Sequence, residues 1–257
     1  MNGLLAEASE DRKPFLAHLE DLRVVLLRSA AALLVAMGIA LVYTPEILGL
    51  LKAPLHGVVT DPDTFLRSIE VAGAFTATLR IAFWSGVVLA APFLVIFIGA
   101  YLVPALTASE RRAVSGVGVL SVILFVAGVA MGYFFTLPFA LRAMFLMHGW
   151  LGVVAEWTLT SYVLFATQLL VAFGLAFELP VVILVLGRLG IISSTWLRTY
   201  RRHAIIVILL LATVLTPPDV FSQLLMAIPL AALYEACVWI IWSWERAAQR
   251  AREEDGA

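Results

Sequence analysis

The chain has 257 residues, of which 62% are hydrophobic and 14% charged. A soluble domain of this length needs more polar surface to cover its core, so this composition excludes an ordinary soluble protein. The formal net charge of −1 excludes little by itself, because positive and negative residues are unevenly distributed along the chain.

The first 23 residues carry many charges and contain no short apolar core, so they lack the pattern of a cleavable signal peptide. The apolar run that follows is therefore expected to be an uncleaved membrane span. Six such stretches occur in the whole chain, at 24–43, 81–103, 113–137, 162–189, 204–215 and 220–242.

A helix needs about 20 apolar residues to cross a hydrocarbon core about 30 Å thick. The fifth stretch has only about 12 residues, which span about 18 Å as a helix. The sixth contains Gln223, Pro229 and Glu235, and residues 216–219 (TPPD) indicate a tight turn between the two. We predict an all-α polytopic membrane protein with six transmembrane helices, short fifth and sixth helices, and a concave, glove-like bundle.

Lys and Arg residues beside the spans predict the orientation, because cytoplasmic loops are enriched in both. Thirteen of the 17 fall on one side, and the other four are Lys52, Arg67, Arg80 and Arg142. We therefore expect one membrane domain over 1–257, with a cytoplasmic segment 1–23, a bundle 24–242 and a cytoplasmic tail 243–257. The connections 44–79 and 138–161 should lie on the outer side and form short helices packed across that end of the bundle.

Cysteine and histidine content argues against an enzyme. The single cysteine, Cys237, excludes an intrachain disulfide and lies in an apolar run, where a packed, inert thiol is expected. The four histidines are scattered without metal-ligand spacing. No catalytic residue, metal or cofactor is expected.

Acidic residues flank the first two spans on the side where mainly positive charge is expected. Glu20 and Asp21 precede the first span, and Glu110 follows the second. A carboxylate can accept two parallel hydrogen bonds from one guanidinium, a geometry that lysine cannot match. The structural alternatives are a solvated charge run or pairing with Arg23 for the first two, and a helix cap for Glu110.

Three polar residues lie in or beside the later spans. Glu178 lies midway along the fourth, where a charged group costs roughly 2.5 kcal/mol or more, so it should face the bundle, water or a partner. Gln223 can hydrogen-bond to another helix. Asp219 is expected to cap the sixth helix, which accounts for it without a functional role.

Five motifs occur in an order that resembles the TatC family, the signal-peptide receptors of the twin-arginine protein translocase. They are HLEDLR at 18–23, KAPL at 52–55, PALTASERR at 104–112, FGLAFELP at 173–180 and LTPPDVFSQ at 215–223. The resemblance covers about 15–242. Two positions depart from the usual family pattern, with Asp21 in place of glutamate and Tyr101 in place of phenylalanine.

The resemblance implies that the consecutive arginines of a signal peptide bind at the cytoplasmic face, and that other residues contact a partner helix or support assembly. The first group is Glu20, Asp21, Arg23, Tyr101 and Glu110, and the second is Glu178, Gln223, Pro54 and Asp219. The implied partners are TatA- and TatB-like single-span subunits, signal peptides of folded cargo and the lipid bilayer, in a multimeric complex of the cytoplasmic (inner) membrane. The proton-motive force would drive export, and no nucleic acid is expected.

Two other classes of function are open at this point. A proton-coupled small-solute transporter with Glu178 as proton carrier would explain the acid within the membrane. It would not explain the acidic residues beside the first two spans or the truncated fifth helix. A membrane-embedded enzyme has the least support.

Overall fold

The computed structural model describes residues 15–59, 61–102, 116–216 and 219–255, and helices joined by short turns and loops make up this part of the chain, with one pair of two-residue strands. The elements are, in chain order, α2 (Phe15–Val42), α3 (Thr44–Lys52), η1 (Ala53–Gly57), α4 (Pro62–Phe65), β1 (Leu66–Arg67), α5 (Gly73–Leu102), α7 (Val117–Met131), the π-helical turn η3 (Gly132–Thr136), α8 (Leu137–Trp150), β2 (Trp157–Thr158), α9 (Leu159–Ala176), α10 (Leu179–Arg188), α11 (Ser194–Thr199), α12 (Arg201–Leu215) and α13 (Val220–Asp255).

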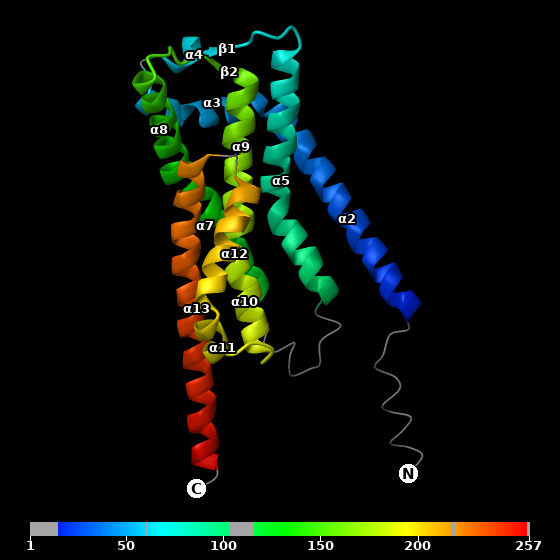
Figure 1. Cartoon of the computed structure of the whole chain (residues 1–257). Coiled ribbons are helices and arrows are strands. Elements are labelled where there is room, and N and C mark those ends of the chain that lie inside the picture. The colour runs from blue at the N-terminus through cyan, green and yellow to red at the C-terminus, as the bar shows by residue number, and fades with distance from the viewer. Residues whose placement is uncertain (1–14, 60, 103–115, 217–218, 256–257) are drawn as a thin grey trace.

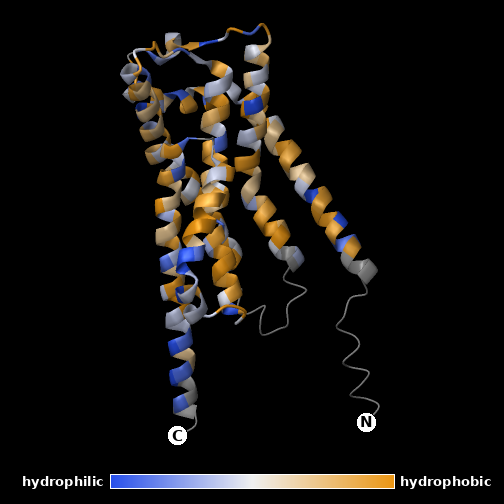
Figure 2. Ribbon diagram, viewed as in Figure 1, coloured by the Kyte–Doolittle hydropathy of each residue, from blue (hydrophilic) through white to orange (hydrophobic). Residues whose placement is uncertain are grey.

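Five segments of the described chain are long and apolar enough to cross a membrane. They are Leu19–Val42, Gly73–Gly99, Val117–Trp150, Leu159–Arg188 and Val220–Arg250. Figure 2 shows apolar residues along the middle of these helices and polar residues gathered on the last turns of α13. With 15 residues, α12 is about 22 Å long and is the short fifth helix that the sequence predicts. The expected all-α, multi-pass architecture is confirmed.

Two details of the sequence prediction are wrong. The sixth helix is not short, because α13 has 36 residues and continues well beyond the apolar stretch. Its last part is rich in Ala, Arg and Glu, which favour helix in water as well as in a membrane. The connection 138–161 does not form a separate helix across the bundle, because α8 continues α7 through η3.

The two ends of the bundle differ in character. Figure 1 shows the first turns of α2 and the last turns of α13 at one end, here called the terminal end. Helix α3 and strands β1 and β2 lie at the opposite end, here called the strand end, and α3 runs across it as predicted. Toward the terminal end, α2 and α5 lean away from α10 and α13, which gives the molecule the expected concave outline.

The fourth span, α9 and α10, forms the centre of the bundle, since 56% of its apolar window is buried against 11% for α2. Glycines let α7 approach it closely. A Cβ on Gly128 would lie 2.5 Å from the Phe173 carbonyl oxygen, and one on Gly174 would lie 2.7 Å from the Phe125 ring. Small residues at such contacts allow helix backbones to pack tightly in membranes.

Side chains from two spans hold α3 in place at the strand end. Pro54 has no N–H to donate to the carbonyl of Leu50, four residues earlier, and that carbonyl accepts a hydrogen bond of 2.8 Å from the Tyr133 hydroxyl. The buried hydroxyl of Tyr162 donates to the next carbonyl, that of Leu51. These bonds help satisfy the carbonyls at the end of α3.

The connections 44–79 and 138–161 also contact each other directly. Strands β1 and β2 pair in parallel, with Leu66 opposite Trp157, and the Phe65 and Trp157 rings meet edge to face at 5.2 Å. The strand end is therefore a packed cap on the bundle.

Candidate functional site

Glu178 lies where the fourth span is interrupted. Pro180 has no N–H for the carbonyl of Ala176, which favours a kink or break in the helix at this position. Phe177 and Glu178 form a turn, in which the Glu178 amide donates to the Leu175 carbonyl at 3.1 Å. The turn separates α9 from α10 at the level of α7.

The carboxylate of Glu178 faces α7. The hydroxyl of Ser121, whose residue is only 3% exposed, donates a hydrogen bond to Glu178 Oε2. The other oxygen, Oε1, is covered by protein atoms and has no hydrogen-bond partner within the described part of the chain. A buried carboxyl oxygen without a donor is costly, so this acid is held in place by packing and one hydrogen bond.

Ser121 is a functional candidate that the sequence reasoning missed. It is the one polar residue of α7, within an otherwise apolar run. Such an isolated hydroxyl is a weak signal, because a serine in a membrane helix can bond back to its own backbone. Only the fold shows that it meets a residue 57 positions away.

Four of the five residues expected to bind the signal peptide lie at the terminal end. Arg23 Nη1 lies 3.3 Å from Glu20 Oε1, and both side chains are about two-thirds exposed, so the intrahelical pair considered from the sequence is present. Asp21 is half-buried on the same turn of α2. Tyr101 is half-buried in the last turn of α5. Glu110 lies outside the described residues, in the segment that joins α5 to α7.

The crossing of α2 and α5 puts Tyr101 at the depth of the turn of α2 that carries Glu20 and Asp21, here called the acidic turn. The backbone of Met37 lies within 3.0 Å of where a Cβ on Gly86 would be, so the two helices touch there. Leu22 and Tyr101 each lie 15 residues from this contact, on helices that run in opposite directions. Because both helices rise about 1.5 Å per residue, Leu22 and Tyr101 lie at the same depth, each about 22 Å from the contact between Met37 and Gly86.

The structure gives Asp219 and Gln223 clear roles within the chain. Asp219 Oδ1 accepts a hydrogen bond of 2.7 Å from the Ser222 amide, so Asp219 caps α13 as predicted. The Gln223 side chain donates to the Leu209 carbonyl at 3.3 Å and to Thr213 Oγ1 at 2.5 Å, which ties α13 to α12. Figure 1 shows that the end of α12 and the start of α13 stop short of the strand end.

Pro54, Glu235 and Cys237 lie elsewhere in the fold. Pro54 is half-buried in η1 at the strand end, at the opposite end of the bundle from Glu20 and Asp21. Glu235 pairs with Arg201 at 2.7 Å, and Cys237 is a buried thiol 3.7 Å from the Pro180 carbonyl oxygen. The structure therefore separates three groups: the acidic turn, Glu178 within the bundle, and the capping and helix-tying residues.

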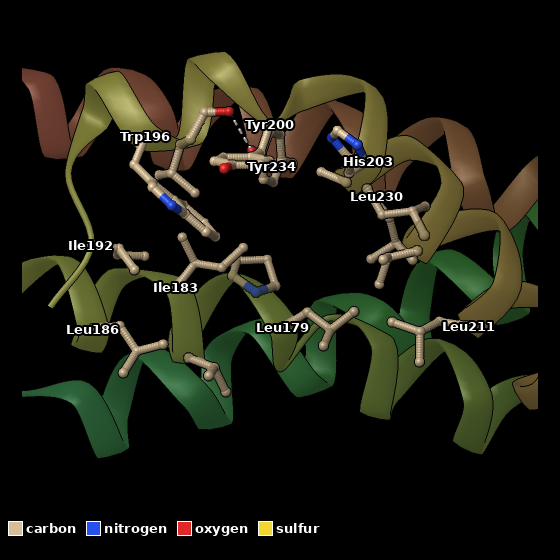
Figure 3. A pocket seen from close by; sticks show the side chains of 16 residues that line it. Leu179, Ile183, Leu186, Ile192, Trp196, Tyr200, His203, Leu211, Leu230 and Tyr234 are labelled. Atoms are coloured by element: carbon tan, nitrogen blue, oxygen red, sulfur yellow. Dashed lines mark hydrogen bonds between the residues drawn. The ribbon is translucent and has the colours of Figure 1, made fainter.

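Two sizeable cavities are almost entirely apolar. One, of about 680 Å³, lies between α2, α3, α5, α7 and α9. The other, of about 370 Å³, lies between α10, α11, α12 and α13, and Figure 3 shows aromatic residues of α11 and α12 facing aliphatic residues of α10 across it. Glu178 lines neither cavity.

Comparison with known proteins gives a consistent result. The family model described as Sec-independent protein translocase protein (TatC) matches residues 17–229. A TatC protein of Carboxydothermus hydrogenoformans is 38% identical over 87% of this chain and 90% of its own length, and that of Escherichia coli K12 is 34% identical over 90% and 88%. A longer TatC protein of Akkermansia muciniphila is 39% identical, and the match covers 74% of this chain and 55% of that protein.

Among solved structures, a crystal structure of the twin-arginine translocase receptor TatC superposes with a TM-score of 0.75 at 31% identity, over 87% of this chain and 97% of that one. The fold and these matches define a multi-pass membrane subunit of a protein translocase, which is a transport component and not an enzyme. The chain belongs to the TatC family.

Proposed function

We propose that this chain is the signal-peptide receptor of its translocase. In this proposal the acidic turn of α2, with Glu20 and Asp21, and Glu110 in the segment after α5 receive the paired arginines of a signal peptide. The main support is the position of Asp21 and Tyr101 at one depth and one end of the bundle, and Glu110 follows Tyr101 by only nine residues in the sequence. The similar protein of known crystal structure is a twin-arginine translocase receptor, which favours the same role here.

The proposed chemistry needs no protein cofactor. A guanidinium presents N–H donors in a planar fork that fits a carboxylate, and such charge-assisted pairs are stronger than neutral hydrogen bonds. Glu20 already shares its carboxylate with Arg23. Arrival of a peptide arginine would compete with that exposed pair, which is worth little in water.

Binding of a twin-arginine peptide to the purified full chain in detergent tests this proposal. We expect Asp21→Asn and Glu110→Gln each to weaken binding by about tenfold or more, as the loss of one charge-assisted hydrogen bond implies. Replacing both peptide arginines with lysines should weaken it similarly. Glu156→Gln, which removes an exposed acid at the strand end, is the matched control and should change nothing. Equal affinity for the arginine and lysine peptides would overturn the proposal.

We further propose that Glu178 meets a polar group on the single helix of a TatA- or TatB-like partner. Its support is a carboxyl group at membrane depth, beside a break in the helix, on a residue that is only half-buried and so partly open to a neighbouring helix. In Glu178→Ala, co-purification of the partner subunits should fall severalfold while peptide affinity stays unchanged. Loss of solute-driven proton uptake into vesicles would instead favour the transporter alternative.

The orientation belongs to the same proposal. We place the terminal end in the cytoplasm and the strand end outside, with the protein in the inner membrane as one membrane domain. The charge distribution supports this, since Arg188, Arg198 and Arg246 lie near the terminal end. A cysteine-labelling reagent that cannot cross the membrane should modify a cysteine placed at Val154 in intact cells, and one placed at Glu253 only after lysis.

A further inference from the structure

Three arginines stack on two tryptophans where α10, α11 and α13 meet at the terminal end. The guanidinium carbon of Arg188 lies 4.6 Å from the ring centroid of Trp244. Those of Arg198 and Arg246 lie 5.6 Å and 4.0 Å from the centroid of Trp242. These five residues are here called the Arg–Trp cluster. Its two indoles are half-buried and its three guanidinium-bearing residues are exposed.

Local structure fixes the positions of the three arginines. Helix α10 ends at Arg188 in a Schellman motif, in which Gly190 has φ 73° and the Ile191 amide donates to the Leu186 carbonyl at 3.0 Å. Arg198 belongs to α11, whose first residue, Ser194, is hydrogen-bonded to α13. Arg246 follows Trp242 by four residues, so both lie on the same face of α13.

The cluster holds more positive charge than its surroundings neutralise. Within the part of the chain that the structure describes, none of its three arginines forms an ion pair with a carboxylate. The adjacent acid, Glu245, accepts a hydrogen bond of 2.9 Å from the Ser194 amide on one oxygen and a bond from the Ser194 hydroxyl on the other. The carboxylate of Glu245 is therefore hydrogen-bonded to α11, and its single negative charge does not balance the three guanidinium groups.

Two of the charges are held close together. Because Arg198 and Arg246 stack on one indole, their guanidinium carbons can be no further apart than the sum of their distances to its centroid. This upper limit on their separation is close to the screening length of about 8 Å at physiological ionic strength, so the two charges repel each other. A guanidinium stacked on a ring keeps its in-plane N–H groups available. Among the described residues, no carboxylate pairs with the arginines of the cluster, and their N–H groups can donate hydrogen bonds to a bound anion.

The depth of the Arg–Trp cluster in the molecule indicates which kind of anion would bind there. Tryptophan is enriched at the boundary between lipid and water, and Trp242 and Trp244 lie where α13 passes from its apolar part to its polar end. Phospholipid phosphates lie at that boundary. We infer that the Arg–Trp cluster binds the phosphate of an anionic phospholipid from the leaflet at the terminal end.

This inference does not rest on the proposed receptor function. The cluster is built from α10, α11 and α13, whereas the acidic turn belongs to α2, and Figure 1 shows α2 and α13 on opposite sides of the bundle. Their charges are also opposite, so the arginines of a signal peptide would be repelled by the cluster. A bound lipid would in addition fasten α11 and the end of α13 to the membrane surface.

The test uses the full chain in mild detergent with dioleoyl phosphatidylglycerol or dioleoyl phosphatidylcholine, and measures retained lipid by native mass spectrometry. We expect phosphatidylglycerol to be retained preferentially, and its affinity to fall about fivefold for each guanidinium removed in Arg198→Gln and Arg246→Gln. Arg67→Gln and Arg142→Gln, at the strand end, are matched charge controls and should retain the preference. Rising salt should weaken phosphatidylglycerol binding in the wild type.

Further variants separate lipid binding from folding. Arg198→Lys and Arg246→Lys keep the charge and should retain most of the lipid preference, whereas Trp242→Leu should reduce it by removing the surface that positions both groups. Equal retention of the two lipids by the wild type would overturn the inference. So would a loss of preference in the strand-end controls as large as that in the cluster variants. Either result leaves the peptide-binding proposal untouched.

Discussion

The hydroxyl of Ser121 in α7 donates a hydrogen bond to the carboxylate of Glu178, at the break between α9 and α10. This contact joins two membrane spans through the one acid of the central span. It also leaves Glu178 with a covered oxygen that no donor reaches among the described residues. The acid is therefore anchored on one side only.

Ser121→Ala should lower the free energy of unfolding by about 1–3 kcal/mol, because it leaves a buried carboxylate without its only donor in the described chain. Adding Glu178→Leu should recover part of the loss, since replacing both members of a buried polar pair is less costly than removing one. Thermal unfolding in detergent measures both effects. Strictly additive effects of the two substitutions would contradict the coupling.

The close approach of α7 to α9 predicts a difference between two glycines of the same helix. Gly128→Ala should destabilise the protein by about 1–3 kcal/mol, because the new methyl group would lie 2.5 Å from the Phe173 carbonyl oxygen. Gly118→Ala is the control, as no described atom lies within 4 Å of the added Cβ. Similar unfolding temperatures for the two variants would show that α7 does not pack as described.

The hydrogen bonds to the end of α3 predict unequal effects for two tyrosines. Tyr162→Phe removes a buried bond to the Leu51 carbonyl and should speed amide hydrogen exchange in α3 at least severalfold. Tyr133→Phe removes the more exposed bond to Leu50 and should have a smaller effect, because water can replace it. A larger effect of Tyr133→Phe would argue against this account of the strand end.

Asp219 allows its structural role to be separated from a functional one. Asp219→Ala should cost about 0.5–2 kcal/mol by removing the cap of α13, whereas Asp219→Asn keeps an acceptor for the Ser222 amide and should cost less. Export of a reporter protein is then compared with stability. If Asn preserves stability but export still fails, the charge itself has a function that the capping role does not explain.

The features that the sequence predicts correctly are those with local causes. Runs of apolar residues mark the spans, the 12-residue fifth stretch already shows that α12 is short, and the acceptor side chain of Asp219 predicts a cap. The motifs at 18–23 and 215–223 are the specific signals of the family, and the other three motifs follow in the expected order.

The features that sequence reasoning missed depend on contacts between distant residues. The sequence around Ser121 does not predict its hydrogen bond to Glu178. The sequence around Tyr162 does not predict its bond to the carbonyl of Leu51, 111 positions away. Hydropathy underestimates the length of α13 because it shows where a helix leaves the bilayer and not where it ends. The π-helical turn η3 that extends the third span has no simple sequence signal either.

The central claim is that the acidic turn of α2 and the end of α5 receive the paired arginines of a signal peptide. A photoreactive amino acid in place of Tyr101 tests it most directly, with one in place of Phe134, exposed on η3, as control. We predict a cross-link from position 101 to the peptide within a few residues of its arginines, abolished by excess unlabelled twin-arginine peptide and absent from position 134. A cross-link from position 134 with none from position 101 would contradict the account.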